Sequence, residues 1–387
     1  PQTKELFEQM DEIKKKEPPK PEISARVLGQ RDKDRRTTYV LRRGEFLEPL
    51  KESEIRPSGL DALPKLMPRE PDVEPDRLDL ASWLVSKDHP LVPRVTVNHV
   101  WRALFGAGIV KTANDFGVRG ELPSHPGLLD WLARDLVERQ AWSRKKLIKQ
   151  IVMSATYRQS SHQRSDLQLS DPTNQWLGRQ NRLRVEGEIV RDICLDASGL
   201  LSRKIGGPSV YPALPAGVAE LSYAGNFKWK ISDGGDRYRR GMYTFFKRTS
   251  PHPNLIAFDC PDANLTCIER NKSNTPIQAL VSLNNESYIE TARAFAKRVL
   301  SNPELTNHSS RLAWAMQTCV ARSPRDEEIR ELLSLLEDSQ ELYQSHADEA
   351  KAIVESYSIP GVHESEIAAW IATSRILLNL DEFITRE

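Results

Sequence analysis

Apolar side chains recur at every third or fourth position along much of this chain, and that spacing places them on one face of a helix. Between Val97 and Phe105 the period is unbroken, and the glycine that follows ends the segment. The predicted helices cover Glu5 to Lys16, Asp79 to Ser86, Val97 to Phe105, Leu183 to Leu201 and Ile367 to Phe383, with others starting near Ser124, Ser143, Thr275 and Ser323. No repeat period emerges, so the pattern predicts a mainly α, multi-helix bundle rather than a solenoid.

Two short stretches have the β-branched and aromatic content of strands. One is Thr37 to Arg42, which a turn at Gly44 follows, and the other is Met242 to Lys247. Between 49 and 77 prolines recur so often that few backbone N–H donors remain for regular structure. We expect this Pro-rich segment to be an extended strap over the surface.

The 387 residues exceed the usual size of a single hydrophobic core, so two helical halves are expected. A middle stretch rich in aromatic residues, glycine and proline separates them. The predicted divisions are an N-terminal helix with short strands (1–48), the Pro-rich strap (49–77), a first helical half (78–208), an irregular aromatic and basic middle (209–274) and a C-terminal helical half (275–387).

Composition excludes several classes of protein. The 55 lysines and arginines balance 54 acidic residues, which leaves a net charge of +1 and no general field for nucleic acid or anionic lipid. The four cysteines are too few and too scattered for a disulfide framework. No apolar run is long enough for a transmembrane segment, and a chain that begins at Pro1 is expected to be a fragment or a processed form.

A local patch interleaves basic and aromatic residues, a composition that single-stranded nucleic acid binders use. Its members are Phe227, Lys228, Trp229, Lys230, Arg237, Tyr238, Arg239 and Arg240. Neither a recognition motif nor a net basic domain accompanies the patch, so a loop packed on a helical core is the favoured interpretation, and no nucleic acid partner is predicted.

Signatures of cofactor and catalytic chemistry are scarce. The Cys-x-x-Cys-His attachment motif is absent, so no haem is expected in this chain. His99, Asp115 and His125 are potential metal ligands, but no pair has the spacing of one helix face, and no metal site is predicted. The chain also lacks a nucleophile elbow and a glycine-rich phosphate loop.

The polar residues around the helix from Val97 to Phe105 need partners if its apolar face is buried. We expect a polar network that joins the two halves and contains Arg94, Asn98, Asp115, Asp259 and Arg270. Within it, a buried Arg94 would pair with a carboxylate from the other half. Other carboxylates that could converge in space are Glu186 and Asp192, and the arginines expected to pair with them are Arg184, Arg191, Arg240 and Arg248.

Seven segments carry a resemblance to a known family: RVTVNHVWRALFGAGIVKTANDFG, SHPGLLDWLA, SATYRQSS, RLRVEGEIVRD, FDCPD, NTPIQALVSLN and LLNLDEF. In this order they resemble the planctomycete-specific PSD-type domain, over roughly Thr38 to Glu387. The resemblance implies a domain of unknown function that follows planctomycete-type cytochrome c modules in large envelope proteins. It therefore implies a periplasmic, envelope or secreted location, with haem only in upstream modules. It carries over no catalytic residue, and His99 stands where the family motif has Arg.

Two hypotheses about function follow. The first is a non-catalytic envelope domain that scaffolds or docks beside cytochrome modules or other envelope proteins. The second is a hydrolase acting on a polysaccharide, with Asp115 and His125 as candidate catalytic residues in a cleft that also contains arginines. The sequence does not decide whether the chain is an enzyme; a deep pocket in which a carboxylate and a histidine meet would favour the hydrolase.

Overall fold

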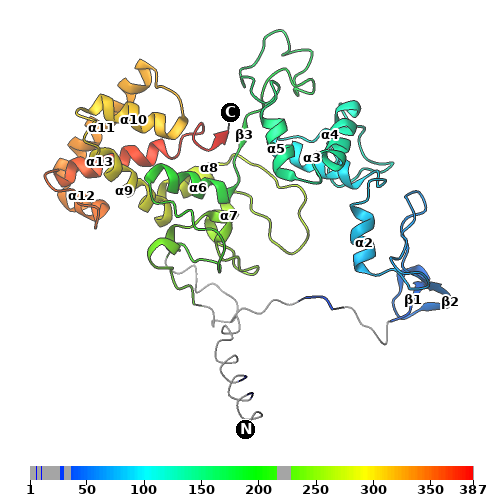
Figure 1. Cartoon of the computed structure of the whole chain (residues 1–387). Helices are drawn as coiled ribbons and strands as arrows, with labels where there is room; N and C mark the ends of the chain where they lie inside the picture. Colours follow the sequence, from blue (N-terminus) through cyan, green and yellow to red (C-terminus); the bar gives the residue numbers. More distant parts are fainter. Residues whose placement is uncertain (1–5, 7–9, 11–26, 30–35, 216–227, 387) are drawn as a thin grey trace. The chain divides into compact units, whose positions relative to one another are not determined.

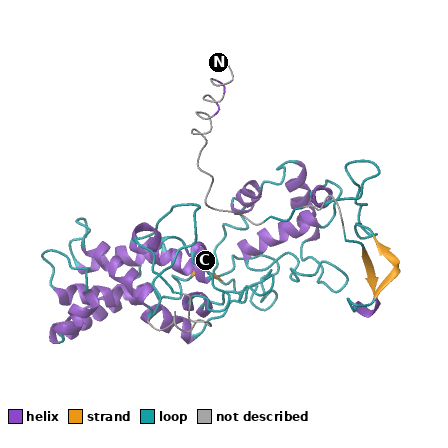
Figure 2. Cartoon of the chain, turned by 90° about the horizontal axis from the view of Figure 1, so that it is seen from below, coloured by secondary structure: helices purple, strands orange, loops and turns teal. Residues whose placement is uncertain are grey.

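The computed structural model describes residues 6, 10, 27–29, 36–215 and 228–386. The chain divides into two compact units, residues 1–88 and residues 89–387, which we treat separately. Helices dominate in the described residues, and strands are few and short (Figure 2). The mainly α prediction is confirmed. None of the described helices combines the length and the apolar character needed to span a membrane. The predicted helix from Glu5 to Lys16 lies almost entirely outside the described residues.

The first unit contains a β-hairpin. Strand β1 (Thr38–Leu41) pairs antiparallel with β2 (Pro49–Ile55), and the register shifts between Tyr39 and Val40. A single 3-10 turn, Arg42–Gly44, leads out of β1 toward β2. The strand predicted at Thr37 to Arg42 is therefore present, but the boundary placed at residue 48 divides the hairpin, because the Pro-rich segment itself supplies β2.

The rest of the Pro-rich segment is irregular and is tied to helix α2 (Arg77–Leu84). The carboxylate of Asp79 on α2 accepts hydrogen bonds from the backbone N–H and the Nε of Arg69, at 3.0 and 2.7 Å. Trp83 donates from its indole nitrogen to the carbonyl of Pro64 at 2.6 Å. A capping box between Asp76 and Asp79 starts α2. Side-chain bonds from α2 thus replace the ladder bonds that proline cannot make.

The second unit begins with a small core of three helices, α3 (Val92–Phe105), α4 (Pro126–Glu138) and α5 (Arg144–Val152). Val97, Leu136 and Leu147, one from each helix, are completely buried in it. Ser143 caps α5 through its side chain, as its position predicts. Trp131 on α4 departs from the pattern: it has helical spacing, but half of its surface is exposed.

The larger core of the second unit lies around the C-terminal helices. They are α6 (Gly187–Ser198), α7 (Pro253–Ala257), α8 (Pro276–Asn284), α9 (Glu286–Leu300), α10 (His308–Val320), α11 (Asp326–Ser345), α12 (Ala347–Val354) and α13 (Glu364–Leu377). Helix α13 packs against α9, α11 and α12 (Figure 1). It carries the fully buried side chains Ile367, Trp370 and Ile371. Helices α8 to α13 lie in the predicted C-terminal half, whereas α6 was predicted in the first half and α7 lies in the predicted irregular middle.

The predicted strand from Met242 to Lys247 is wrong. A 3-10 turn, Gly241–Tyr243, occupies its first part, and only an isolated bridge between Val210 and Thr244 follows. No strand of the described residues pairs with this segment. Gly241, directly before it, lies against α6, where a Cβ atom would lie 2.4 Å from the carbonyl oxygen of Glu188. The remainder of the described middle stretch contains a 3-10 turn at Gly234–Tyr238 and the short helix α7, and is otherwise irregular, as predicted.

The end of the described chain connects the two cores of the second unit. Strand β4 (Thr385–Arg386) pairs antiparallel with β3 (Leu183–Arg184), and the C-terminus lies beside β3 in Figure 1. The helix predicted from Leu183 therefore starts only at Gly187, because its first residues are in β3. Arg386 also donates to the carbonyl of Leu104 at the end of α3, at 2.6 Å.

Candidate functional site

Arg94 does not make the predicted contact. Its Nε lies 2.7 Å from the Oδ1 of Asp130 on α4, and it also donates to the carbonyl of Pro90. About a third of the Arg94 side chain is exposed. The expected pairing with Asp259 is replaced by a local contact between two adjacent helices, α3 and α4.

Asn98 is completely buried and makes a two-sided contact with one residue. Its side chain donates to the carbonyl of Val110 at 2.9 Å and accepts from the Val110 N–H at 2.8 Å. Gly108 leaves room for this contact, since a Cβ there would lie 2.7 Å from the Asn98 amide nitrogen. Asn98 therefore fixes the loop after α3 and has no role in linking the two halves.

Asp115 and His125, the candidate catalytic residues, have local structural roles. The Asp115 carboxylate accepts a hydrogen bond from the Gly117 N–H at 2.8 Å, which closes a turn. His125 is the N-cap position of α4, and its Nδ1 lies 2.9 Å from the hydroxyl of Ser124. Within the described part of the chain, no hydrogen bond or ion pair joins Asp115 to His125. The structure does not assemble them into a catalytic pair.

Asp259 and Arg270 do lie near each other, in a polar junction between the two cores. Asp259 accepts from the N–H and the hydroxyl of Ser273, both at 2.7 Å, and adopts the left-handed backbone conformation (φ 59°). Arg270 pairs with Glu188 at 2.8 Å and with Glu186 at 3.1 Å. These bonds hold the loop between α7 and α8 against the start of α6.

The contact of this junction with the first core comes from Arg102, not from Arg94. Arg102 on α3 pairs with Glu269 at 3.1 Å and donates to the carbonyl of Ile268. On the other side, Arg184 donates to Gln278 and pairs with Asp381. The junction therefore combines five of the segments that carried the family resemblance, and its charges are matched by direct partners.

The basic and aromatic patch of the middle stretch is also used internally. Arg237 pairs with Glu290 at 3.0 Å, and Arg240 pairs with Asp192 at 2.7 Å. Arg239 is completely buried, with its guanidinium 3.7 Å from the centre of the Tyr243 ring. Phe227 lies outside the described residues. These contacts match the interpretation as a loop packed on a helical core.

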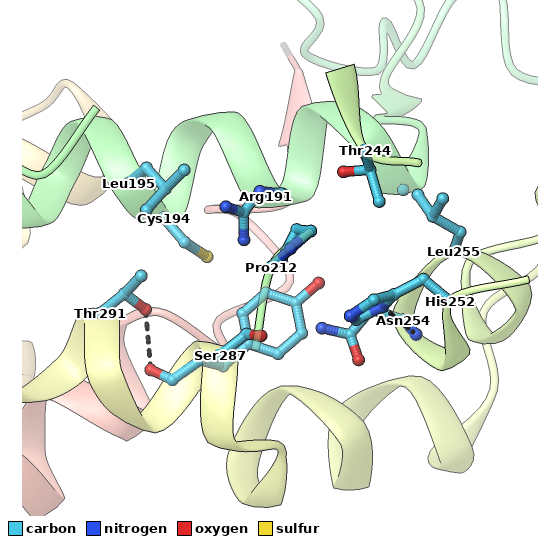
Figure 3. A pocket seen from close by; sticks show the side chains of 12 residues that line it. Arg191, Cys194, Leu195, Pro212, Thr244, His252, Asn254, Leu255, Ser287 and Thr291 are labelled. Atoms are coloured by element: carbon cyan, nitrogen blue, oxygen red, sulfur yellow. Dashed lines mark hydrogen bonds between the residues drawn. The ribbon is translucent and has the colours of Figure 1, made fainter. Parts of the chain in front are cut away.

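A separate enclosed pocket lies where α6, α7 and α9 meet (Figure 3). The groups around it come from Gly187, Arg191, Cys194 and Leu195 on α6, His252, Asn254 and Leu255 at α7, Ser287, Tyr288 and Thr291 on α9, and Pro212 and Thr244 from the middle stretch. The free space at its centre is about 10 Å³, which is room for a single water molecule. It is too small for a sugar ring.

The polar groups of this pocket are unusual because several lack partners. The Thr244 hydroxyl, the Asn254 side-chain oxygen and the Tyr288 hydroxyl are buried without a hydrogen bond in the described structure. Arg191 donates to the carbonyls of Arg237 and Arg239 at 2.7 and 3.3 Å. It was expected to pair with a carboxylate, but no carboxylate of the described residues lies within 4 Å of it.

Burial keeps the titratable groups of the pocket uncharged. Desolvation raises the pKa of the Cys194 thiol and of the Tyr288 hydroxyl. It lowers the pKa of His252 to about 4. His252 accepts from the N–H of Asn254 at Nδ1, so its Nε2 donates to the carbonyl of Ala213 at 3.0 Å. A neutral thiol and a neutral phenol are poor nucleophiles near pH 7, so this pocket does not resemble a hydrolase centre.

His252 leads to a prediction about pH. Its pKa is lower in the folded protein than in the unfolded chain, so the unfolded chain binds more protons between about pH 6.5 and 4. Stability is then complete above about pH 6.5 and decreases by up to about 3 kcal/mol as the pH falls through this window. In the variant His252→Asn, urea unfolding followed from pH 7 to 4 should lose this part of the pH dependence. The variant His162→Asn, at an exposed histidine, should retain the parent's slope.

Metal-ligating residues do not gather in the described structure: no group of three or more His, Cys, Asp or Glu residues there could hold an ion. The four cysteines are all free thiols.

Comparison with known protein families assigns the chain to one of them. The family model PSD1, described as a protein of unknown function (DUF1553), matches residues 76–336, about two thirds of the chain. The chain belongs to the PSD1 family. No curated protein and no solved structure matches it significantly. The PSD1 match includes the polar junction up to Gln278 and the whole pocket. It ends within α11, so α12, α13 and β4 lie beyond it although they belong to the same core and junction.

Sequence reasoning missed the pocket. Arg191 was counted among the arginines that pair with carboxylates, and Tyr288 was not among the candidate residues. One signal was present: Arg191 lies three and four positions from the buried residues Cys194 and Leu195 on its helix. An arginine at such a position in a PSD1 domain needs an explanation other than solvation.

Proposed function

We propose that this PSD1 domain is a non-catalytic scaffold of the cell envelope, which docks beside c-type cytochrome modules of a larger protein. The observation that carries the proposal is the arrangement of its candidate catalytic residues. Asp115 closes a turn and His125 starts a helix, and the two have no bond to each other in the described structure. The sequence resembles domains that follow cytochrome modules in larger envelope proteins. This resemblance supports both the docking role and a location outside the cytoplasm.

The ion pairs of the junction support a structural role. Arg102, Arg184 and Arg270 each have a carboxylate partner within 3.1 Å. Charges paired in this way hold segments in place, and they leave little unsatisfied charge for a substrate. A scaffold needs this property, because it has to hold one module at a fixed position relative to the next.

An exposed apolar face on α8 is a suitable place for docking. Ile277 and Leu280 are three positions apart on this short helix, and 63% and 58% of their surfaces are exposed. Ile256 on α7, which packs against α8, is also more than half exposed. Apolar residues grouped at the surface indicate protein contacts. We assign this α8 face to the cytochrome module.

The test uses the tagged chain as bait for the solubilised envelope of the source organism. Retained polypeptides are separated under denaturing conditions and stained for covalently bound haem. We expect the parent to retain a haem-bearing polypeptide and the double variant Ile277→Asp, Leu280→Asp to retain about tenfold less or lower, since each charge would be buried in the contact. Ile148→Asp, on the exposed side of α5, is the matched control and should bind like the parent.

Two results would contradict the proposal. One is haem retention that is absent, or that the α8 substitutions leave unchanged. The other is release of reducing sugars from envelope polysaccharide by the parent that is lost in both Asp115→Ala and His125→Ala, which would establish the hydrolase instead.

A further inference from the structure

The region around the pocket contains more guanidinium groups than carboxylates that pair with them. Four guanidinium groups, those of Arg191, Arg237, Arg239 and Arg240, face two carboxylates. Glu290 pairs with Arg237 and Asp192 pairs with Arg240, so both carboxylates are already engaged.

Arg191 and Arg239 remain without a carboxylate partner in the described structure. Arg239 is fully buried and donates to the carbonyls of Lys204, Gly206 and Pro208. Arg191 donates to two backbone carbonyls, which leaves three of its five N–H groups without a hydrogen bond in the described residues. Arg191 is half-buried, and its remaining N–H groups can donate to an anion in the pocket.

The pocket offers a place for one. Figure 3 shows the Arg191 guanidinium pointing inward above Pro212, and Tyr288 also lines the pocket. The Tyr288 and Thr244 hydroxyls, at 5% and 9% exposure, have no hydrogen-bond partner among the described residues and can each donate a hydrogen bond. Asn254 is 8% exposed, and its unpartnered oxygen can only accept, so it takes a water or a donor at the edge of the site.

We infer that the pocket bounded by Arg191, Thr244 and Tyr288 is a binding site for one small monovalent anion of about the size of a halide ion. The free space of about 10 Å³ accepts a single water-sized particle. A cation is disfavoured beside Arg191, and a larger anion such as sulfate exceeds the space. The bound anion would offset the positive charges of Arg191 on α6 and of the arginines in residues 237–240. It would thereby help to hold the middle stretch on the core. This inference does not depend on the proposed docking function.

The test measures thermal unfolding of the whole chain at constant ionic strength while sodium gluconate is replaced by sodium chloride or sodium bromide. A ligand that binds only the folded state raises the melting temperature in a saturable way. We expect a rise on the order of 2 °C or more in the parent. In Tyr288→Phe, which removes a hydroxyl that has no partner among the described residues, the apparent affinity should fall about tenfold. Tyr238→Phe is the matched control, since this hydroxyl donates to Glu290 and does not line the pocket.

The outcomes separate an anion from a water molecule. A saturable halide effect that Tyr288→Phe weakens and Tyr238→Phe preserves supports the site. An equal response in all three proteins, or no dependence on the identity of the anion, would mean that the space holds only water and would overturn the inference. Crystals grown in bromide give a second measurement: an anomalous peak beside Arg191 is expected, and bromide peaks found only elsewhere would contradict it.

Discussion

Replacing Trp370 by alanine is expected to lower the free energy of unfolding by about 3 to 5 kcal/mol, the cost of removing a large aromatic side chain from a packed core. Trp370 on α13 is completely buried. It lies in the core formed with α9 and α11, where partial collapse around the vacated space cannot restore the lost contacts. A loss of this size is a large fraction of the stability of an ordinary domain.

The measurement is urea unfolding followed by far-ultraviolet circular dichroism, which does not depend on tryptophan fluorescence. Trp131→Ala is the matched control, because Trp131 is 49% exposed and its removal should cost roughly half as much or less, about 1 to 2 kcal/mol. Trp370 lies beyond the last residue of the PSD1 match, so the comparison also tests whether the folding unit extends past that boundary. Equal unfolding midpoints for the two variants would show that α13 is not part of the stabilising core.

The helices could be predicted because their signal is local. The period of apolar residues in α3, α4 and α13 depends only on neighbours three and four positions away, and each of these helices has the buried face that its period requires. The capping serine at the start of α5 is a local signal of the same kind.

The elements that were missed depend on contacts distant in sequence. Leu183 and Arg184 continue a helical pattern, but they pair with residues 385–386 as a strand. Met242 to Lys247 has strand composition, but Gly241 lies against α6 and turns the backbone. A local pattern contains no information about either partner.

The prediction of the candidate site from the sequence was limited in the same way. Asp259 and Arg270 were placed in a polar network, and both lie in the junction. Arg94 was assigned a partner across the molecule, although Asp130 on the neighbouring helix was available. The pocket beside Arg191 required three helices to be placed in space before its unpartnered hydroxyls could be recognised.

Replacing Asn98 by alanine is expected to cost about 2 to 4 kcal/mol, because both backbone groups of Val110 would lose their hydrogen bonds inside the protein. Val110 is itself buried, so water cannot readily replace the lost partner. Asn98→Asp should be at least as destabilising as Asn98→Ala, although it keeps the shape of the side chain. A carboxylate can still accept from the Val110 N–H, but it cannot donate to the carbonyl, and a buried charge is added.

Urea unfolding of the two variants, with Asn114→Ala as an exposed control nearby, measures these effects. Loss of the hydrogen bonds predicts that both substitutions destabilise the protein. An unfolding midpoint for Asn98→Ala equal to that of Asn114→Ala would mean that the loop at Val110 folds without Asn98. The close contact between the Asn98 side chain and the backbone at Gly108 would then have to serve another purpose.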